Sequence, residues 1–444
     1  MGTKTERRMT LPSLHGIDIS NTNRIQFIEK NDDTNKQNIP GNLFQNQFKT
    51  KKISFGESRS SMGYFRPTWI EIDMGNLCSN VRLLKKYIGK NVHLMAIVKA
   101  NAYGFGINEI ASAAIGSGAT WLGVATLDEA MSLRMNVTKN VPILVLGYVQ
   151  PQHLSIASRY NITVTCVSIQ WIEEAIEYAV EPVDFHLKVD TGLNRLGIKS
   201  TDELQSILDI VNSNKYLNFA GIFTHFATSG DMNDRTYFQN QLNGFKEYLN
   251  VIPDIKNKIV HCANSDAALC QPEKPFYNMV RLGKSLLGPP PAELNRFMPF
   301  QLKHTISLHS SIVLIKKLDE NESVGYSGEY KTEKKEWIAT LPIGYADGWH
   351  QQFKMTHVII DTIKVPIVGR IAMDQMCIAL PEYYPVGTKV TFIGEQNGER
   401  ITAYDISVNA KQPEAEVLTG LAARIPRLYI HNGSVFHIQN SLLN

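Results

Sequence analysis

The feature that most constrains the fold is a regular alternation of short apolar runs with amphipathic helical stretches along the middle of the chain. The helical spacing of apolar residues is clear at 128–134, 201–212 and 239–250. Alternating β and α units predict a parallel sheet, and eight of them over about 220 residues predict a closed (β/α)8 barrel of the TIM type. The apolar runs that we expect to form its strands are 92–98, 121–125, 142–146, 162–166, 183–189, 219–223, 259–262 and 278–282.

The sequence on either side of this alternation has a different character. Residues 1–63 are rich in Asn, Gln, Lys, Ser and Thr without a sustained apolar period, so we expect a polar, mobile N-terminal extension. Residues 64–75 contain a strand-like stretch that we expect to join a β domain. We assign 76–297 to the barrel and 298–444 to a C-terminal, mostly β domain, whose strand-like runs are 307–315, 337–341, 357–360, 389–392 and 401–406.

Composition excludes several classes of protein. Hydrophobic residues make up 43% of the 444 residues and charged residues 20%, which is typical of a soluble globular protein. The formal net charge of +3 gives no electrostatic support for nucleic-acid binding, and no apolar run approaches the roughly 18 residues of a membrane span. Five cysteines without a Cys-x-x-Cys pair suit a reducing compartment, so we expect a cytoplasmic protein without a metal site.

Polar residues follow five of the predicted strands directly. Barrel active sites are built at the carboxyl ends of the strands, so these residues are expected to share one face. Lys99 ends the first apolar run, and a lysine there has its pKa lowered toward that of a useful nucleophile when it is desolvated. One such lysine or histidine alone is more often a surface or structural group, but five clusters indicate a site. The other four clusters are 188–195, His225, 261–265 and 281–284.

Several motifs identify a family. The stretch from Pro67 to Arg427 resembles the alanine racemases, pyridoxal-phosphate enzymes of the barrel type (fold type III). The resemblance implies a (β/α)8 barrel followed by a β domain, and an isomerase that interconverts L- and D-alanine. The segments that carry it are 98–104, 188–197, 261–265, 279–281, 325–326, 344–348 and 369–375.

The resemblance implies a pyridoxal 5'-phosphate site on the barrel. Lys99 matches the lysine that holds the cofactor as a Schiff base. Arg281 matches the arginine that faces the pyridine nitrogen; because a guanidinium does not give up its proton, the ring is expected to stay unprotonated and to be a weaker electron sink. The remaining cofactor-binding residues implied by the resemblance are Tyr103, His225, Asn264, Ser265 and the backbone at Gly283 and Lys284.

The resemblance also implies two bases, one on each face of the substrate. Lys99 serves one face and Tyr326 the other, with polar support from His225. In the family, the tyrosine comes from the β domain of a second subunit, which implies a homodimer with shared sites. Arg195, Met373 and Tyr345 then match substrate-binding residues, and Lys188, His261 and Asp374 match supporting ones; Lys188 corresponds to a lysine that is carbamylated in many relatives.

Three positions depart from the family pattern. Phe105 replaces a usual histidine at a position that we expect to be structural, and Gln351 replaces a common arginine, which alters the expected support of the second base. Ala423 stands where a tyrosine normally narrows the substrate entrance.

These observations leave more than one function open. The leading hypothesis is an alanine racemase that supplies D-alanine for cell-wall peptidoglycan. The alternatives are a racemase of serine or of broader specificity, which Ala423 favours, and a non-catalytic pyridoxal-phosphate-binding homologue, which the presence of Tyr326 disfavours. A barrel decarboxylase would require a cysteine-bearing motif that the sequence lacks.

Overall fold

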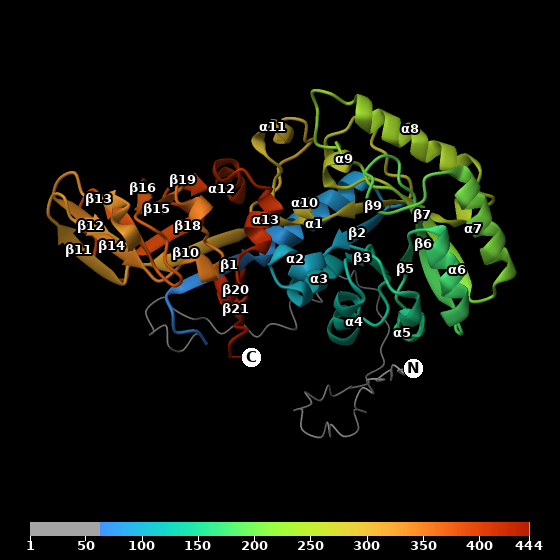
Figure 1. Cartoon of the computed structure of the whole chain (residues 1–444), viewed down its shortest axis with the longest axis horizontal. Helices are drawn as coiled ribbons and strands as arrows, with labels where there is room; N and C mark the ends of the chain where they lie inside the picture. Colours follow the sequence, from blue (N-terminus) through green and yellow to red (C-terminus); the bar gives the residue numbers. More distant parts are fainter. Residues whose placement is uncertain (1–62, 444) are drawn as a thin grey trace, which may run out of the picture. The chain divides into compact units, whose positions relative to one another are not determined.

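A computed structural model describes residues 63–443, so the expected N-terminal extension lies outside the described residues except at its last position. The central feature is a barrel of eight parallel strands, each on one of the eight predicted runs, and the barrel prediction is confirmed (Figure 1). The strands are β2 (His93–Ile97), β3 (Trp121–Val124), β4 (Ile143–Val145), β5 (Val164–Cys166), β6 (Val183–Lys188), β7 (Leu217–Phe223), β8 (Ile259–His261) and β9 (Met279–Leu282).

Strand pairing follows chain order around the barrel. The strands form two parallel groups, β9-β2-β3-β4 and β5-β6-β7-β8. A bridge between Leu144 and Thr163 joins the groups on one side, and the Arg281 amide donates to the Ala263 carbonyl at 3.0 Å on the other. The carboxyl ends of all eight strands therefore meet on one face, as expected for a parallel barrel.

Helices pack outside the strands and begin at local sequence signals (Figure 1). Thr126 and Glu129 form a capping box at the start of α4, and Ser200 and Glu203 form another at α7. The elements of this layer are α1 (Met74–Ile88), α2 (Lys99–Tyr103), α3 (Ile107–Gly116), α4 (Leu127–Asn136), η2 (Pro151–His153), α5 (Leu154–Arg159), α6 (Ile169–Tyr178), α7 (Thr201–Ser213), α8 (Thr236–Asn250), η3 (Ile255–Asn257), α9 (Ser265–Leu269), α10 (Lys284–Leu287) and α11 (Ala292–Asn295).

The β domain is built on one large sheet that includes a strand from before the barrel. β1 (Thr68–Asp73) pairs antiparallel with β10 (Ile306–Ser311) and parallel with β20 (Arg427–His431). The sheet order is β11-β14-β17-β16-β15-β18-β10-β1-β20-β21, with β19 paired to β18. The other strands are β11 (Leu314–Leu318), β12 (Ser323–Val324), β13 (Tyr330–Lys331), β14 (Glu336–Leu341), β15 (His357–Ile360), β16 (Ile363–Val368), β17 (Met376–Leu380), β18 (Lys389–Gln396), β19 (Glu399–Ile401) and β21 (Ser434–Gln439).

The structure corrects two of the predicted strands. The run 307–315 divides into β10 and β11, because the Ile312 amide donates to Thr388, just before β18, whereas the Val313 amide donates to Thr340 on β14. The run 401–406 is wrong beyond Ile401: Thr402 caps a helix, α12 (Ala403–Ala410), by accepting from the Asp405 amide at 3.1 Å while Asp405 bonds back to Thr402. This capping box outweighs the β-like alternation. The remaining helical elements of the domain are η4 (Tyr326–Gly328), η5 (Tyr345–Asp347), η6 (Gln351–Phe353) and α13 (Glu414–Thr419).

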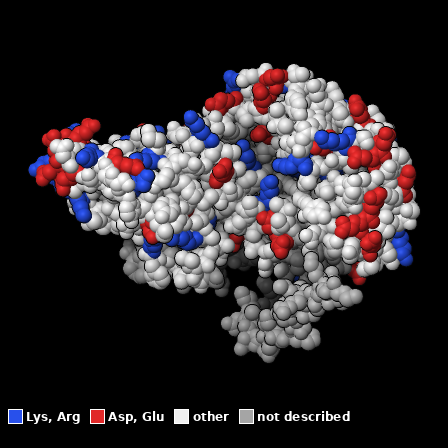
Figure 2. All heavy atoms as spheres, in the orientation of Figure 1, with Lys and Arg blue, Asp and Glu red and all other residues white. Residues whose placement is uncertain are grey.

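Contacts from β20 hold the barrel loop that follows β2. The Tyr429 hydroxyl donates to the Phe105 carbonyl at 2.9 Å, and Arg427 Nε donates to the Gly104 carbonyl at 3.2 Å. Phe105 and Tyr429 are both buried, which agrees with the structural role expected for Phe105. None of the helices in the described part is long and apolar enough to cross a membrane. Figure 2 shows acidic and basic side chains interspersed over the visible face.

Candidate active site

A cavity of about 340 Å³ lies at the carboxyl ends of the barrel strands. It gathers residues that follow β2, β6, β7, β8 and β9, so the five predicted clusters do meet on one face. The predicted residues that line it are Lys99, Tyr103, Lys188, Arg195, His225, Asn264, Ser265, Arg281, Gly283 and Lys284.

Lys99 presents a free amine to this cavity. The pKa of Lys99 is below its ordinary value, mainly because the amine is partly buried and also because of the nearby positive charge of Arg195. The negative charge of Glu129 raises the pKa but does not outweigh these two effects. The side chain has no hydrogen-bond partner among the described residues. A half-buried lysine with a lowered pKa and no partner is suited to act as a nucleophile.

The backbone after Lys99 is strained. Ala100, Asn101, Ala102 and Tyr103 have φ values of 53°, 54°, 51° and 57°, so α2 is a left-handed turn. A left-handed conformation is costly for residues with a Cβ atom. The Glu129 carboxylate holds the turn by accepting from the Ala100 amide at 2.7 Å, and Asn101 Oδ1 accepts from the Ile107 amide at 2.8 Å.

Arg281 lines the same cavity as Lys99, and both of its terminal nitrogens make hydrogen bonds. Its Nη1 donates to His261 Nδ1 at 2.9 Å, and its Nη2 lies 3.0 Å from His225 Nδ1 and near the carbonyls of Thr224 and Cys262. Burial lowers the pKa of Arg281 to about 10, so the guanidinium remains charged at neutral pH. Its Nε–H has no partner among the described residues and is available to an acceptor in the cavity.

The donors of Arg281 fix the protons of a buried histidine pair. A guanidinium only donates, so His261 Nδ1 must accept and His261 must carry its proton on Nε2. His261 Nε2 donates it to His186 Nδ1, 2.9 Å away, so the His186 proton lies on Nε2, a buried atom without a hydrogen-bond partner among the described residues. Burial, then Arg281, lowers the pKa of both histidines, so both are neutral at pH 7.

The sequence analysis missed His186. The signal that identifies it is alternation: His186 and Lys188 are two residues apart on β6 and therefore lie on the same face of that strand. His225, which was expected to support Tyr326, bonds to Arg281 instead within the chain. Burial, then the charge of Arg281, lowers the pKa of His225 to about 2, so it too is neutral.

A second group of residues that line the cavity fits a phosphate group. The amides of Gly283 and Ser285 make only long contacts, 3.4 Å each, to Ser265 Oγ, and the Lys284 amide has no partner among the described residues. A Cβ on Gly283 would lie 2.7 Å from Tyr103 Oη, so any larger residue there would displace the Tyr103 hydroxyl from the cradle. Burial, then Asp266, raises the pKa of Tyr103 to about 12, which keeps its hydroxyl a donor. Asn264 contributes differently: its side chain accepts from the Ala267 amide and caps α9.

Together these groups fit pyridoxal phosphate. The cavity offers an unpaired amine at Lys99, amide and hydroxyl donors at Gly283, Lys284 and Tyr103, and the free Nε–H of Arg281. Lys188 lies beside them, with its Nζ 4.9 Å from the centre of the Phe223 ring. Burial, then Arg281, lowers the pKa of Lys188 well below its ordinary value.

Five predicted residues do not line this cavity: His261, which is fully buried, and four residues of the β domain. Tyr326, Met373 and Tyr345 are 69%, 53% and 40% exposed, and the Asp374 side chain is 60% exposed. All four lie on turns and loops of the β domain. The structure therefore brings the cofactor-side residues and Arg195 together at the cavity. The proposed second base and the other two substrate-side residues, Met373 and Tyr345, lie on the surface of the same chain.

Gln351 and Ala423 occupy the same domain. Gln351 Oε1 accepts from the Ile371 amide at 3.3 Å and its Nε2 donates to the Ile371 carbonyl, so it holds the loop before Met373. Ala423 is exposed. The Tyr429 ring is buried, and its hydroxyl donates to the Phe105 carbonyl.

Comparisons with known proteins agree with this geometry. The family model described as alanine racemase, N-terminal domain, matches residues 72–291, and the one described as alanine racemase, C-terminal domain, matches 305–429. The chain is 45% identical over 386 residues to alanine racemase 1 of Bacillus subtilis, covering 86% of this chain and 98% of that protein. It is 40% identical to alanine racemase of Geobacillus stearothermophilus, covering 85% and 97%.

Solved structures give the same result. The crystal structure of alanine racemase from Bacillus anthracis with bound L-Ala-P has a TM-score of 0.81 at 37% identity, covering 85% of this chain and 99% of that one. A histidine racemase from Leuconostoc mesenteroides has a TM-score of 0.76 at 32% identity, covering 82% and 98%.

Proposed function

The chain belongs to the alanine racemase family of pyridoxal-phosphate-dependent isomerases, and on that basis we propose that it interconverts L- and D-alanine at the cavity around Lys99. The observation that carries the proposal is the unpaired Lys99 amine, which has a lowered pKa and shares the cavity with Arg281 and the Gly283 cradle. When bound, pyridoxal phosphate supplies an electron sink that acidifies the Cα–H of the amino acid.

The protein residues then divide the work. Lys99 takes or returns the Cα proton on one face, and Tyr326 does so on the other. Arg195, exposed at the cavity and without a partner among the described residues, receives the substrate carboxylate together with the Met373 amide. The neutral His225, His261 and His186 hold Arg281 in place without adding charge.

Exposure of Tyr326, Met373 and Tyr345 supports a homodimer. These three side chains match residues that a complete racemase site needs, yet they are exposed on the surface of one chain. A dimer in which each chain completes the site of the other accounts for both facts. We further propose a cytoplasmic location, which the five free cysteines support, and a role in supplying D-alanine for peptidoglycan.

The test of the site is Lys99→Ala. Borohydride reduction of the wild-type holoenzyme is expected to attach the cofactor covalently to the peptide that contains Lys99, as read by mass spectrometry. Lys99→Ala should lose this attachment and racemise alanine at background rate, whereas Lys246→Ala, at an exposed position of α8, should keep both. Normal turnover by Lys99→Ala would overturn the assignment, and cofactor attachment without racemisation by the wild type would indicate a non-catalytic carrier.

The test of shared sites is complementation. Lys99→Ala chains lack one base and Tyr326→Phe chains lack the other. Mixing the two is expected to restore activity through heterodimers that carry one intact site. No recovery, despite subunit exchange demonstrated with tagged chains, would refute the shared arrangement.

A second candidate is a racemase of serine or of broader specificity. Ala423 is exposed and has no side chain beyond its methyl group at a position where the family resemblance predicts a tyrosine that narrows the entrance, and this feature supports the second candidate. The similarity to a protein titled histidine racemase shows that this fold is also found in a protein named for a larger amino acid.

A further inference from the structure

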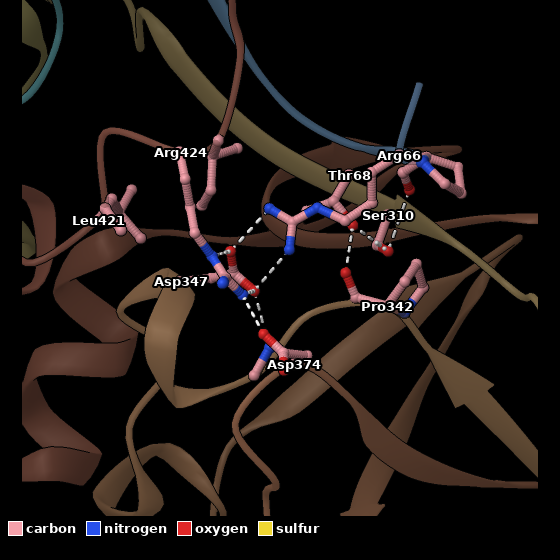
Figure 3. Close-up of polar contacts among 12 residues, drawn as sticks. Arg66, Thr68, Ser310, Pro342, Asp347, Asp374, Leu421 and Arg424 are labelled. Carbon is pink, nitrogen blue, oxygen red and sulfur yellow. Dashed lines mark hydrogen bonds and ion pairs between the residues drawn. The ribbon is translucent and has the colours of Figure 1, made fainter. Parts of the chain in front are cut away.

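One arginine of the β domain joins two loops that matter for substrate binding. Arg424 directly follows Ala423. Its Nε donates to Asp347 Oδ1 at 2.7 Å, and its Nη2 donates both to Asp347 Oδ2 at 3.1 Å and to Asp374 Oδ1 at 2.7 Å (Figure 3). Arg424 therefore bridges the η5 turn, which contains Asp347, and the loop between β16 and β17, which contains Asp374.

The bridged loop carries a free amide. The Tyr345 amide donates to the Ala372 carbonyl and the Ala346 amide donates to the Met373 carbonyl, both at 3.0 Å. The Met373 amide itself has no hydrogen-bond partner among the described residues. Its position depends on how firmly the residues around it are held.

We propose that Arg424 is a positioning residue that ties the 371–375 loop to the η5 turn and so sets where the Met373 amide meets the substrate carboxylate. The inference rests on the proposed function, which assigns that amide to the carboxylate. If Arg424 acts in this way, its bond to Asp374 strengthens substrate binding, which its bonds to Asp347 alone would not do.

Arg66 provides a matched comparison. Asp347 is fully buried, and Arg66 also binds it with two hydrogen bonds, Nη2 to Oδ1 at 2.7 Å and Nη1 to Oδ2 at 3.0 Å. The Arg66 and Arg424 side chains are equally exposed, at 29%. Of the two, only Arg424 bonds to Asp374 (Figure 3).

Asp347 remains paired when either arginine is removed. Burial alone would raise the pKa of Asp347, but the hydrogen bonds from Arg424, Arg66 and the Gly344 amide outweigh it and hold the pKa below its ordinary value. Arg66→Met and Arg424→Met each remove one of the two guanidinium groups. We therefore expect the two variants to lose similar thermal stability. A difference between them in hydrogen exchange or in KM then reports on the bond from Arg424 to Asp374.

The first measurement is hydrogen exchange in the holoenzyme. Arg424→Met should speed exchange of the amides in 371–375 by about two- to fivefold, the range that one exposed ion pair supports. Arg66→Met should leave those amides at the wild-type rate. Equal rates in the two variants, raised or unchanged, would overturn the proposal.

The second measurement separates binding from chemistry. Arg424→Met should raise KM for L-alanine by about two- to fivefold while kcat changes by less than twofold, and Arg66→Met should leave KM unchanged. Asp374→Ala cuts the same bond at an exposed side chain without touching Asp347, so it should reproduce the effect even where Arg424→Met folds poorly. In the double variant the effects of Arg424→Met and Asp374→Ala should not add.

Additive effects of Arg424→Met and Asp374→Ala on KM would show that Arg424 does not act through Asp374 and would refute the proposal. Failure of the proposed function gives a different result. If wild-type protein does not racemise alanine, the kinetic comparison has no signal, but the hydrogen-exchange comparison still decides whether Arg424 holds the loop.

Discussion

The left-handed turn after Lys99 predicts an unusual response to glycine. Ala100 has a φ of 53°. This conformation costs an L residue about 1–2 kcal/mol, and glycine removes that cost at the expense of about 0.5–1 kcal/mol of backbone entropy. Ala100 is exposed, and its amide bond to Glu129 does not involve the side chain. We therefore expect Ala100→Gly to raise the free energy of unfolding by about 0.5–1 kcal/mol.

A right-handed helix gives the opposite sign and serves as the control. Glu247 is exposed on α8, where glycine should be less stable than alanine by about 1 kcal/mol. The assay is the urea midpoint, measured for all variants at one protein concentration with excess pyridoxal phosphate, because ligand and partner binding shift apparent stability. Glu247→Gly should have a lower urea midpoint than Glu247→Ala. If Ala100→Gly likewise has a lower midpoint than the wild type, the turn is not strained and the reasoning is refuted.

Three further predictions concern the site. Tyr326→Phe should slow deuterium incorporation at Cα more from one enantiomer than from the other, whereas Tyr383→Phe, at another exposed tyrosine of the β domain, should change neither; equal losses would argue against two bases. The wild type should racemise serine as well as alanine, and Ala423→Tyr should raise the ratio of kcat/KM for alanine to that for serine by about 10- to 200-fold. An unchanged ratio would show that Ala423 does not set specificity. Gly283→Ala should weaken pyridoxal-phosphate binding by about 1–3 kcal/mol in a spectroscopic titration, because its Cβ would lie 2.7 Å from Tyr103 Oη, and Gly244→Ala, with no atom closer than 4.0 Å, should bind normally; normal binding by both would reject the cradle.

The barrel could be predicted because its signal is repeated and local. Each of the eight strands is a short apolar run, and five of them lead into a polar cluster, so errors at single boundaries do not change the count. In the β domain the same approach failed at 401–406, where apolar alternation continues through Thr402. The Thr402–Asp405 capping box is the local signal that indicates a helix here, and it outweighs the alternation.

The α2 turn could not have been predicted from local sequence. Ala100 and Ala102 are strong formers of right-handed helices. Their left-handed conformation depends on contacts made by residues elsewhere, above all the Glu129 carboxylate on the Ala100 amide. Sequence patterns report local preference, whereas this turn is a case in which tertiary contacts outweigh it.

The two halves of the proposed site are under different physical constraints. Arg281, His261 and His186 are buried in a chain of hydrogen bonds whose proton positions are fixed by one guanidinium, so a change at any of them leaves a buried polar group unpaired. Tyr345, Met373 and Ala423 lie on exposed loops joined through Arg424, where a substitution meets little packing. The chemistry of the cofactor side is therefore expected to tolerate few substitutions. The substrate side is expected to change more readily at single positions, and Ala423 is the position there at which the sequence predicts a departure from the family pattern.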